Sequence, residues 1–189
     1  MRIAVIGTGH IGGTLGSRWR EAGQDVVYGS RNPGGTGPGG APLLPVAEAV
    51  ASADAVLIAV PGAAVPEVAG LLGGALDGKV VIDATNRFGE PVANSHAAIT
   101  AAAPGASYAR AFNTLGWENF ADPLPGTDLF FASDPQARPA AEELISAIGL
   151  GPVYVGGADA AGTVDSLLGL WVALTRQNGT RKLAFRLVR

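Results

Sequence analysis

The order of apolar and polar positions divides the chain into short apolar runs that alternate with segments of helical character. Strands are predicted at residues 2–6, 25–28, 41–44, 55–60, 79–83, 107–112, 128–133 and 153–155, and helices at 11–22, 46–53, 63–76, 94–103, 135–148 and 163–174. The run at 55–60 is apolar without alternation, as in strands that are buried on both faces of a parallel sheet. This pattern predicts an α/β fold of the Rossmann type, with a doubly wound, mainly parallel sheet.

A glycine-rich turn follows the first predicted strand and opens the first predicted helix. Strand, glycine turn, helix and strand is the order of a dinucleotide-binding βαβ unit. In such a unit the first glycine permits the tight turn, the second lets the backbone approach a pyrophosphate, and the third lets the helix pack near the strand. The amino terminus of the helix offers free N–H groups to the phosphates. The residues predicted to line the dinucleotide here are Gly7, Thr8, Gly9, His10, Ile11 and Gly12.

The end of the second strand predicts which dinucleotide binds. NAD enzymes usually have Asp or Glu at this place to bind the ribose 2′-OH. Here the place holds Gly29, followed by Ser30, Arg31 and Asn32. A hydroxyl and a guanidinium hold a 2′-phosphate by charge-assisted hydrogen bonds, whereas a carboxylate would repel it. The alternative is an ordinary surface arginine in a loop, and the sequence favours NADP.

Two segments depart from the regular alternation. Residues 32–40 are rich in glycine and proline and cannot form the usual crossover helix. We expect a loop that either closes over the adenosine end of the cofactor or acts as a solvated linker, and the linker is favoured. The helix at 163–174 is apolar around most of its circumference, which indicates burial on several sides. We therefore expect a dinucleotide-binding domain at 1–157 and a helical tail at 158–189 that covers the cofactor pocket and contacts either its own domain or a second subunit.

Composition excludes several classes of function. The chain has 189 residues, 48% of them hydrophobic, and a formal net charge of −3, so neither nucleic acid nor an acidic membrane is an expected partner. It has no cysteine and only two histidines, which leaves no thiolate nucleophile and no usual zinc site. The first strand begins at Arg2 and no apolar run reaches the length of a membrane span, so we expect a cytoplasmic protein.

The usual proton-transfer groups are also missing. There is no Gly-x-Ser-x-Gly motif, and no tyrosine is followed four residues later by lysine. Asp83 ends a strand, where an acid more often caps the next turn. We therefore predict no catalytic acid or base and no metal ligand, but hydride transfer between two cofactors that the protein aligns. The strand ends that would clamp them carry Val60, Pro61, Asn86, Asn113, Thr114, Leu115 and Trp117.

Several motifs together resemble one family. Gly-Thr-Gly-His-Ile-Gly at 7–12, Tyr-Gly-Ser-Arg-Asn at 28–32, Ala-Phe-Asn-Thr at 111–114, Thr-Val-Asp-Ser-Leu at 163–167 and Gln-Asn-Gly at 177–179 are similar to the NADP oxidoreductases dependent on the deazaflavin coenzyme F420. This resemblance implies that NADP(H) lies along Thr8 to Ile11 with Ser30 and Arg31 on its 2′-phosphate.

The same resemblance assigns the other end of the site. It implies that Val60, Val65 and Asn86 flank the nicotinamide and that coenzyme F420 lies over it near Asn113 to Trp117, with the tail around Leu183 closing the pocket. Family members often have a small residue at the position of Trp117. Family members are typically homodimers, which implies a homodimer here.

Three functions fit these observations. The first is an NADP(H)-dependent oxidoreductase that exchanges a hydride with coenzyme F420. The second keeps NADPH and changes the small-molecule acceptor to a flavin, a ferric chelate, or a small imine or ketone. The third is a non-enzymatic NADP-binding redox sensor.

Overall fold

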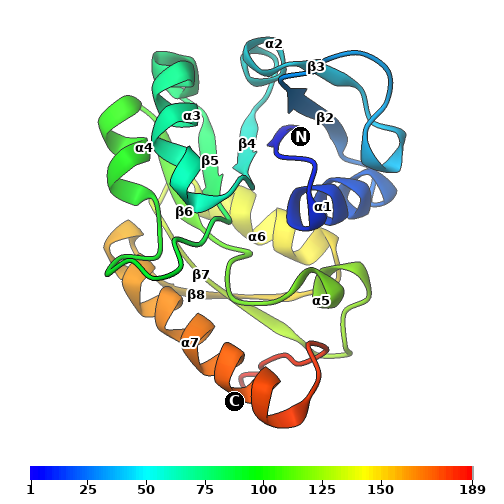
Figure 1. The fold of residues 1–189 in the computed structure, drawn as a ribbon, viewed down its shortest axis with the longest axis vertical. Coiled ribbons are helices and arrows are strands. Elements are labelled where there is room, and N and C mark those ends of the chain that lie inside the picture. Colours follow the sequence, from blue (N-terminus) through cyan, green and yellow to red (C-terminus); the bar gives the residue numbers. More distant parts are fainter. Residues whose placement is uncertain (189) are drawn as a thin grey trace.

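A single sheet runs through the computed structural model, which describes residues 1–188 (Figure 1). Its eight strands lie in the order β3-β2-β1-β4-β5-β6-β7-β8. They are β1 (Arg2–Ile6), β2 (Asp25–Ser30), β3 (Leu43–Pro45), β4 (Ala55–Ile58), β5 (Val80–Asp83), β6 (Ser107–Arg110), β7 (Asp128–Ser133) and β8 (Gly151–Gly156). Strands β1 to β6 are parallel, β7 is antiparallel to β6, and β8 is parallel to β7. The order 3-2-1-4-5-6 of the parallel strands confirms the predicted Rossmann-type sheet.

Helices cover both faces of the sheet. They are α1 (His10–Glu21), α2 (Val46–Ala51), α3 (Val65–Leu72), α4 (His96–Ala102), α5 (Trp117–Ala121), α6 (Arg138–Ala147) and α7 (Ala161–Asn178), with short 3-10 turns η1 (Pro38–Gly40), η2 (Gly62–Ala64), η3 (Gly73–Leu76) and η4 (Ala158–Ala160). One core cluster joins α1, α5 and α6 to the sheet through buried residues such as Trp19, Phe120 and Leu144. The second joins α2, α3 and α4 to the sheet through residues such as Val50 and Ile99.

Most predicted elements are present, and the differences have local causes. The predicted helix at 63–76 is divided into η2, α3 and η3, because Gly73 adopts a φ of 43° that ends α3. Helix α5 was not predicted, since five residues are too few to show a helical period. The reversed direction of β7 was also not predicted, because the pattern of apolar residues within a strand does not encode its direction.

The glycine-rich segment after β2 is folded against α1. The turn η1 packs on that helix, and a β-carbon added at Gly13 would lie 3.3 Å from Pro38 Cγ. An isolated bridge between Thr36 and Pro42 closes the base of the loop. The absence of a crossover helix is therefore confirmed. The loop packs on α1 through η1 while residues 31–36 are exposed, so the choice between a cofactor lid and a solvated linker stays a prediction.

The tail packs on the antiparallel end of the sheet. Helix α7 contacts β7 and β8, and it buries Ala161, Val164 and Trp171. After the helix, Phe185 forms an isolated bridge with Asp128 at the start of β7. The expected burial of the tail against its own domain is thus present, while Leu170 keeps 50% of its surface exposed. None of the helices within residues 1–188 is long and apolar enough to cross a membrane.

Candidate nucleotide and acceptor site

The carboxyl ends of the parallel strands form one level edge. In the sheet register Ile6 pairs with both Gly29 and Ile58, Ile58 pairs with Asp83, and Asp83 pairs with Arg110. The loops that carry the predicted site residues therefore leave the sheet side by side. In open α/β sheets, ligands bind outside the carboxyl ends of the strands where the strand order reverses, which is between β1 and β4 here.

The three motif glycines meet three different surroundings. Gly7 has a φ of 115°, and a β-carbon there would lie 2.4 Å from the carbonyl oxygen of Ala59 in the adjoining strand loop. At Gly12 a β-carbon would lie 2.0 Å from the carbonyl oxygen of Gly7. A β-carbon at Gly9 would meet nothing within 4 Å. Gly7 and Gly12 are thus required by the fold, whereas a side chain at Gly9 would meet no protein atom, which agrees with the prediction that a pyrophosphate approaches the backbone here.

Helix α1 begins directly on this space. Its N-cap is Gly9, no side chain caps it, and its first turn contains no acidic residue. Thr8, Gly9 and His10 are exposed and Ile11 is partly buried. The positive end of the helix dipole and its N–H groups are therefore available to an anion, as phosphate binding requires.

Ser30 and Arg31 lie beside the glycine turn at the end of β2. Ser30 Oγ accepts a hydrogen bond from the backbone N–H of Asn32 at 3.0 Å, which holds the three residues in a compact turn. Arg31 is exposed and takes part in none of the ion pairs found within residues 1–188. A guanidinium without a carboxylate partner next to a phosphate-binding turn fits the predicted 2′-phosphate site.

Asn86 and Asn113 are brought together, but their side chains face a buried network. Asn86 Nδ2 donates to the carbonyl oxygen of Asn113 at 2.9 Å, and Asn86 Oδ1 accepts from Arg110 Nη2 at 2.9 Å. Asn113 Nδ2 donates to Asp165 Oδ1 at 3.0 Å, and its Oδ1 is buried without a partner among the described residues. The two amides therefore shape the strand-end loops, and the Asn113 oxygen is one acceptor that the network leaves unused.

Arg110 is the centre of this network and is fully buried. Its Nε donates to Asp165 Oδ1 at 2.7 Å, and its Nη1 donates to the carbonyl oxygens of Asp83 at 3.1 Å and Thr85 at 2.5 Å. It also forms ion pairs with Asp83 at 3.3 Å and Asp165 at 2.7 Å. A buried guanidinium has to be paired and hydrogen-bonded, and here both requirements are met.

Asp83 caps the loop after β5, as the sequence predicted. Its Oδ1 accepts from the N–H of Thr85 at 2.9 Å, and its Oδ2 accepts from the N–H of Ser95 at 2.7 Å and from Tyr108 Oη at 2.9 Å. Burial, together with the neighbouring Asp83 carboxylate, raises the pKa of Tyr108 well above its usual value. Tyr108 therefore remains a neutral donor to Asp83 rather than an acid or base in the site.

The remaining predicted residues differ in exposure. Phe112 has a φ of 62°, which a non-glycine residue rarely adopts, and it is held there by edge-on contacts with Trp19 and Phe120. The predicted site residues that follow Phe112 and the one on α3 are buried. The predicted site residues after β4 and in the tail are at least partly exposed. The buried ones are Asn113, Thr114, Leu115 and Val65, and the others are Val60, Pro61 and Leu183.

An aromatic stack joins the glycine turn to α5, and Gly116 before α5 lies close to the tail. The rings of His10 and Trp117 stack with their centroids 5.2 Å apart and an angle of 17° between the ring planes. The residue before Trp117 is Gly116, where a β-carbon would lie 3.1 Å from Trp171 Cη2. Arg181 pairs with Glu118 at 2.7 Å, and its guanidinium lies over the Trp171 ring, 5.2 Å from the ring centroid.

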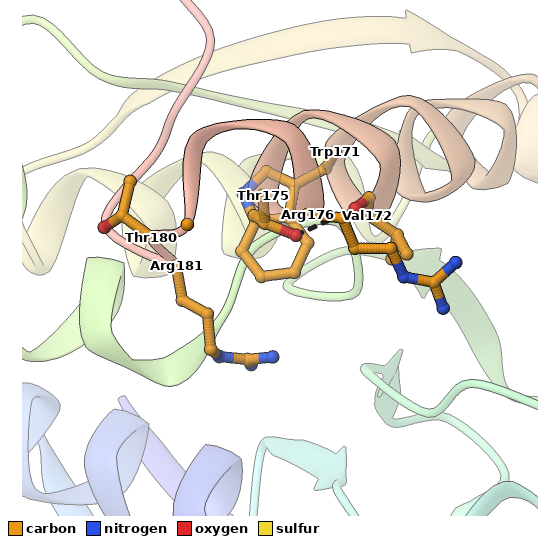
Figure 2. A pocket seen from close by; sticks show the side chains of 7 residues that line it. Trp171, Val172, Thr175, Arg176, Thr180 and Arg181 are labelled. Atoms are coloured by element: carbon orange, nitrogen blue, oxygen red, sulfur yellow. Dashed lines mark hydrogen bonds between the residues drawn. The ribbon is translucent and has the colours of Figure 1, made fainter.

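A pocket of about 360 Å³ opens at the end of α7 (Figure 2). Figure 2 shows that the side chains of Arg176 and Arg181 both point away from the helix, with the Trp171 ring between them. The lining residues are Trp171, Val172, Thr175, Arg176, Gly179, Thr180 and Arg181. Arg181 already pairs with Glu118, whereas Arg176 takes part in no ion pair found within residues 1–188 and is placed to meet a negatively charged ligand. Within residues 1–188 no group of three His, Asp or Glu side chains is placed to bind a metal ion.

The sequence of the first half matches a known family. Residues 2–87 match the sequence model of the NADP oxidoreductases that depend on coenzyme F420. The match indicates an NADP-dependent oxidoreductase. It includes the glycine turn, the Ser30–Arg31 turn and Asn86, and it ends before Arg110, Asn113 and α7.

Solved structures share the fold of this NADP oxidoreductase. A proposed F420-dependent NADP reductase from Arthrobacter sp. FB24 is 24% identical with a TM-score of 0.84, and the match covers 100% of both chains. A hypothetical protein from Sinorhizobium meliloti is 27% identical with a TM-score of 0.71, over 86% of this chain and 88% of that one. The 3-hydroxyisobutyrate dehydrogenase of Mycobacterium tuberculosis is 20% identical with a TM-score of 0.70, over 94% of this chain but 62% of its own.

Sequence reasoning missed Arg110 and Asp165 as parts of the site. Arg110 sits in a strand that otherwise reads as buried, and a charged residue in such a strand is a signal that it has a buried partner. Asp165 interrupts the apolar tail helix and was noted only as part of a motif. The two are 55 positions apart, so their contact is visible only in the folded chain.

Proposed function

We propose that this protein exchanges a hydride between NADP(H) and the deazaflavin coenzyme F420. The hydride leaves C4 of the dihydronicotinamide and forms a C–H bond at C5 of the deazaflavin, and one proton from solvent completes the reduced deazaflavin. NADP would bind with its pyrophosphate over Gly9 and its 2′-phosphate on Ser30 and Arg31. Its nicotinamide would lie over the ends of β4, β5 and β6.

The observation that carries the proposal is the continuity between the two halves of the site. The glycine turn reaches the α7 pocket through the His10–Trp117 stack and the close approach of Gly116 to Trp171. Two ring systems bound on either side of this path would be held close to each other. Hydride transfer between such rings needs alignment and exclusion of water more than it needs an acid or base.

One further feature supports a second cofactor rather than a small ketone or imine. Arg176 lines the pocket at the end of α7, and coenzyme F420 carries negative charge. A small neutral ketone or imine would not use this group. The unused Asn113 Oδ1 is a buried acceptor that the carboxamide of bound NADP(H) would satisfy with any of these acceptors, so it does not discriminate between them.

A spectroscopic assay tests the proposal. Protein, NADPH and oxidised coenzyme F420 are mixed, and the loss of the deazaflavin absorbance is followed, with flavin mononucleotide, a ferric chelate and a cyclic imine as alternative acceptors in parallel. We expect bleaching of the deazaflavin and much slower reaction with the others. Faster reduction of an alternative acceptor, or no reaction with the deazaflavin while NADPH binds, would refute the proposal.

Arg176 and Arg138 provide matched variants for the same assay. Arg176→Ala should raise the KM for the deazaflavin and leave NADPH binding unchanged, because Arg176 lies in the α7 pocket. Arg138→Ala removes an arginine from the surface pair with Glu142 on α6 and serves as the control. Equal effects of the two arginine variants would show that the α7 pocket does not bind the acceptor.

A further inference from the structure

The buried network around Arg110 joins three segments that are distant in the sequence. Asp83 ends β5, Arg110 ends β6, and Asp165 lies on α7, one turn after its start. All three side chains are almost completely removed from solvent, with exposures of 0%, 0% and 10%. Their contacts therefore link the loops at the nicotinamide end of the predicted site directly to the helix that lines the α7 pocket.

Asp165 is the member on the acceptor side, and it accepts from three side chains. Its Oδ1 accepts from Arg110 Nε at 2.7 Å and from Asn113 Nδ2 at 3.0 Å, and its Oδ2 accepts from Asn94 Nδ2 at 2.8 Å. Arg110 and Asn113 belong to β6 and the loop after it, while Asn94 belongs to the loop after β5. One carboxylate of α7 thus holds both of the strand-end loops.

Apolar packing and this carboxylate hold α7 in different ways. Val164 and Trp171 are buried against the domain, and the hydrophobic effect that favours their burial is not directional. Charge-assisted hydrogen bonds to a guanidinium are directional and geometrically specific. From Asp165 to Arg176 the helix extends about 16 Å, so a small rotation at Asp165 displaces the pocket side chains by a larger amount.

We propose that Asp165 and Arg110 are positioning residues that hold α7 and the strand-end loops in the alignment that hydride transfer requires. This inference rests on the proposed function, and it assigns a role in the reaction to residues that touch neither cofactor. Misplacement of reacting groups by about 1 Å can lower a rate by about 100-fold without changing the chemistry. A loss of alignment should therefore lower the rate of hydride transfer while NADPH still binds through the glycine turn and Arg31.

Asp165→Asn is the variant of choice because Arg110 keeps its second carboxylate. Asp83 remains 3.3 Å from Nη1, so the buried guanidinium is not left uncompensated and the fold should survive. The new amide group faces the amide of Asn94, where a donor would meet a donor. Adding Asn94→Asp to Asp165→Asn restores a donor and an acceptor across this contact. An aspartate at 94 also still accepts the N–H of His96, which now lies 3.2 Å from Asn94 Oδ1.

The test compares single-turnover hydride transfer from NADPH to coenzyme F420 with NADPH affinity. For Asp165→Asn we expect the rate of hydride transfer to fall by at least about tenfold. The NADPH dissociation constant should stay within about twofold of the wild-type value. The isotope effect with NADPH deuterated at the transferred position should be larger than in the wild type. The double variant should recover a large part of the rate. Ile145→Ala, which removes buried volume from α6 away from the network, controls for destabilisation alone.

Dihydronicotinamide fluorescence of bound NADPH gives a readout that needs no acceptor. We expect its intensity and anisotropy to fall in Asp165→Asn and to recover in the double variant. If the wild type fails to reduce the deazaflavin but the fluorescence responds in this way, the proposed acceptor is wrong and the positioning of the nicotinamide loops stands. Unchanged fluorescence, unchanged transfer, or the same loss in Ile145→Ala would overturn the positioning role.

Discussion

Arg31 provides the sharpest test of NADP selectivity. Its guanidinium is exposed at the end of β2, beside the glycine turn, and forms no ion pair within residues 1–188. Truncation to alanine therefore removes no ion pair found within residues 1–188, and little change in stability is expected. Ser30 keeps its hydrogen bond to Asn32, so the turn itself persists in the variant.

The magnitude follows from the contact that is removed. A hydrogen bond to a charged group contributes about 1.5–3 kcal/mol, and 1.4 kcal/mol is about a factor of ten in affinity. Arg31→Ala should therefore weaken NADPH binding by about 10- to 150-fold. NADH has no 2′-phosphate, so its affinity should remain nearly the same. Arg31→Lys should recover only part of the loss, because an ammonium keeps the charge but not the planar fork.

Calorimetric dissociation constants for NADPH and NADH give the decisive ratio. Arg20→Ala, which removes an exposed arginine from α1, is the matched control for the general electrostatic attraction of the domain. Raising the salt concentration should weaken NADPH binding to the wild type more than to Arg31→Ala, because the lost contact is the screened one. An NADPH-to-NADH ratio that is unchanged in Arg31→Ala, or changed equally in Arg20→Ala, would refute the assignment of the 2′-phosphate site.

Three other outcomes follow from the structure. Gly9→Val should fold normally and lose NADP binding, whereas Gly12→Ala should lower the melting temperature. The reason is that a side chain at position 12 collides with the backbone and one at position 9 does not. Equal melting temperatures of the two variants would contradict this. The pKa of Tyr108 is raised in the folded state, so its contribution to stability is complete below the unfolded-state pKa of about 10 and is lost as the pH rises toward the folded-state pKa. Tyr108→Phe should therefore flatten the alkaline limb of a stability–pH curve. The same variant loses the hydrogen bond to Asp83. The expected homodimer should be visible by sedimentation, and if α7 forms its interface, Leu170→Glu should shift it toward monomer; a monomeric wild type would remove this inference.

Features that depend on residues close together in the chain could be predicted from the sequence. Gly7, Gly9 and Gly12 have the spacing of a phosphate-binding turn, and the structure gives each the surroundings that this spacing predicted. The capping role of Asp83 is equally local, since Thr85 lies two positions away. The parallel sheet followed from alternating apolar runs and helical segments, because the period of the apolar residues reports which surfaces are buried.

The way in which distant segments meet could not be predicted from the sequence. The reversal of β7, the compact fold of the glycine-rich loop on α1 and the attachment of α7 depend on contacts that no local pattern encodes. The Arg110–Asp165 pair joins positions 55 residues apart, and each residue alone reads as an irregularity in an apolar element. A buried charge tells the reader of a sequence that a partner exists, since an unpaired one would be too costly. Only the fold shows which partner it is, because pairing energy depends on distance and burial rather than on spacing along the chain.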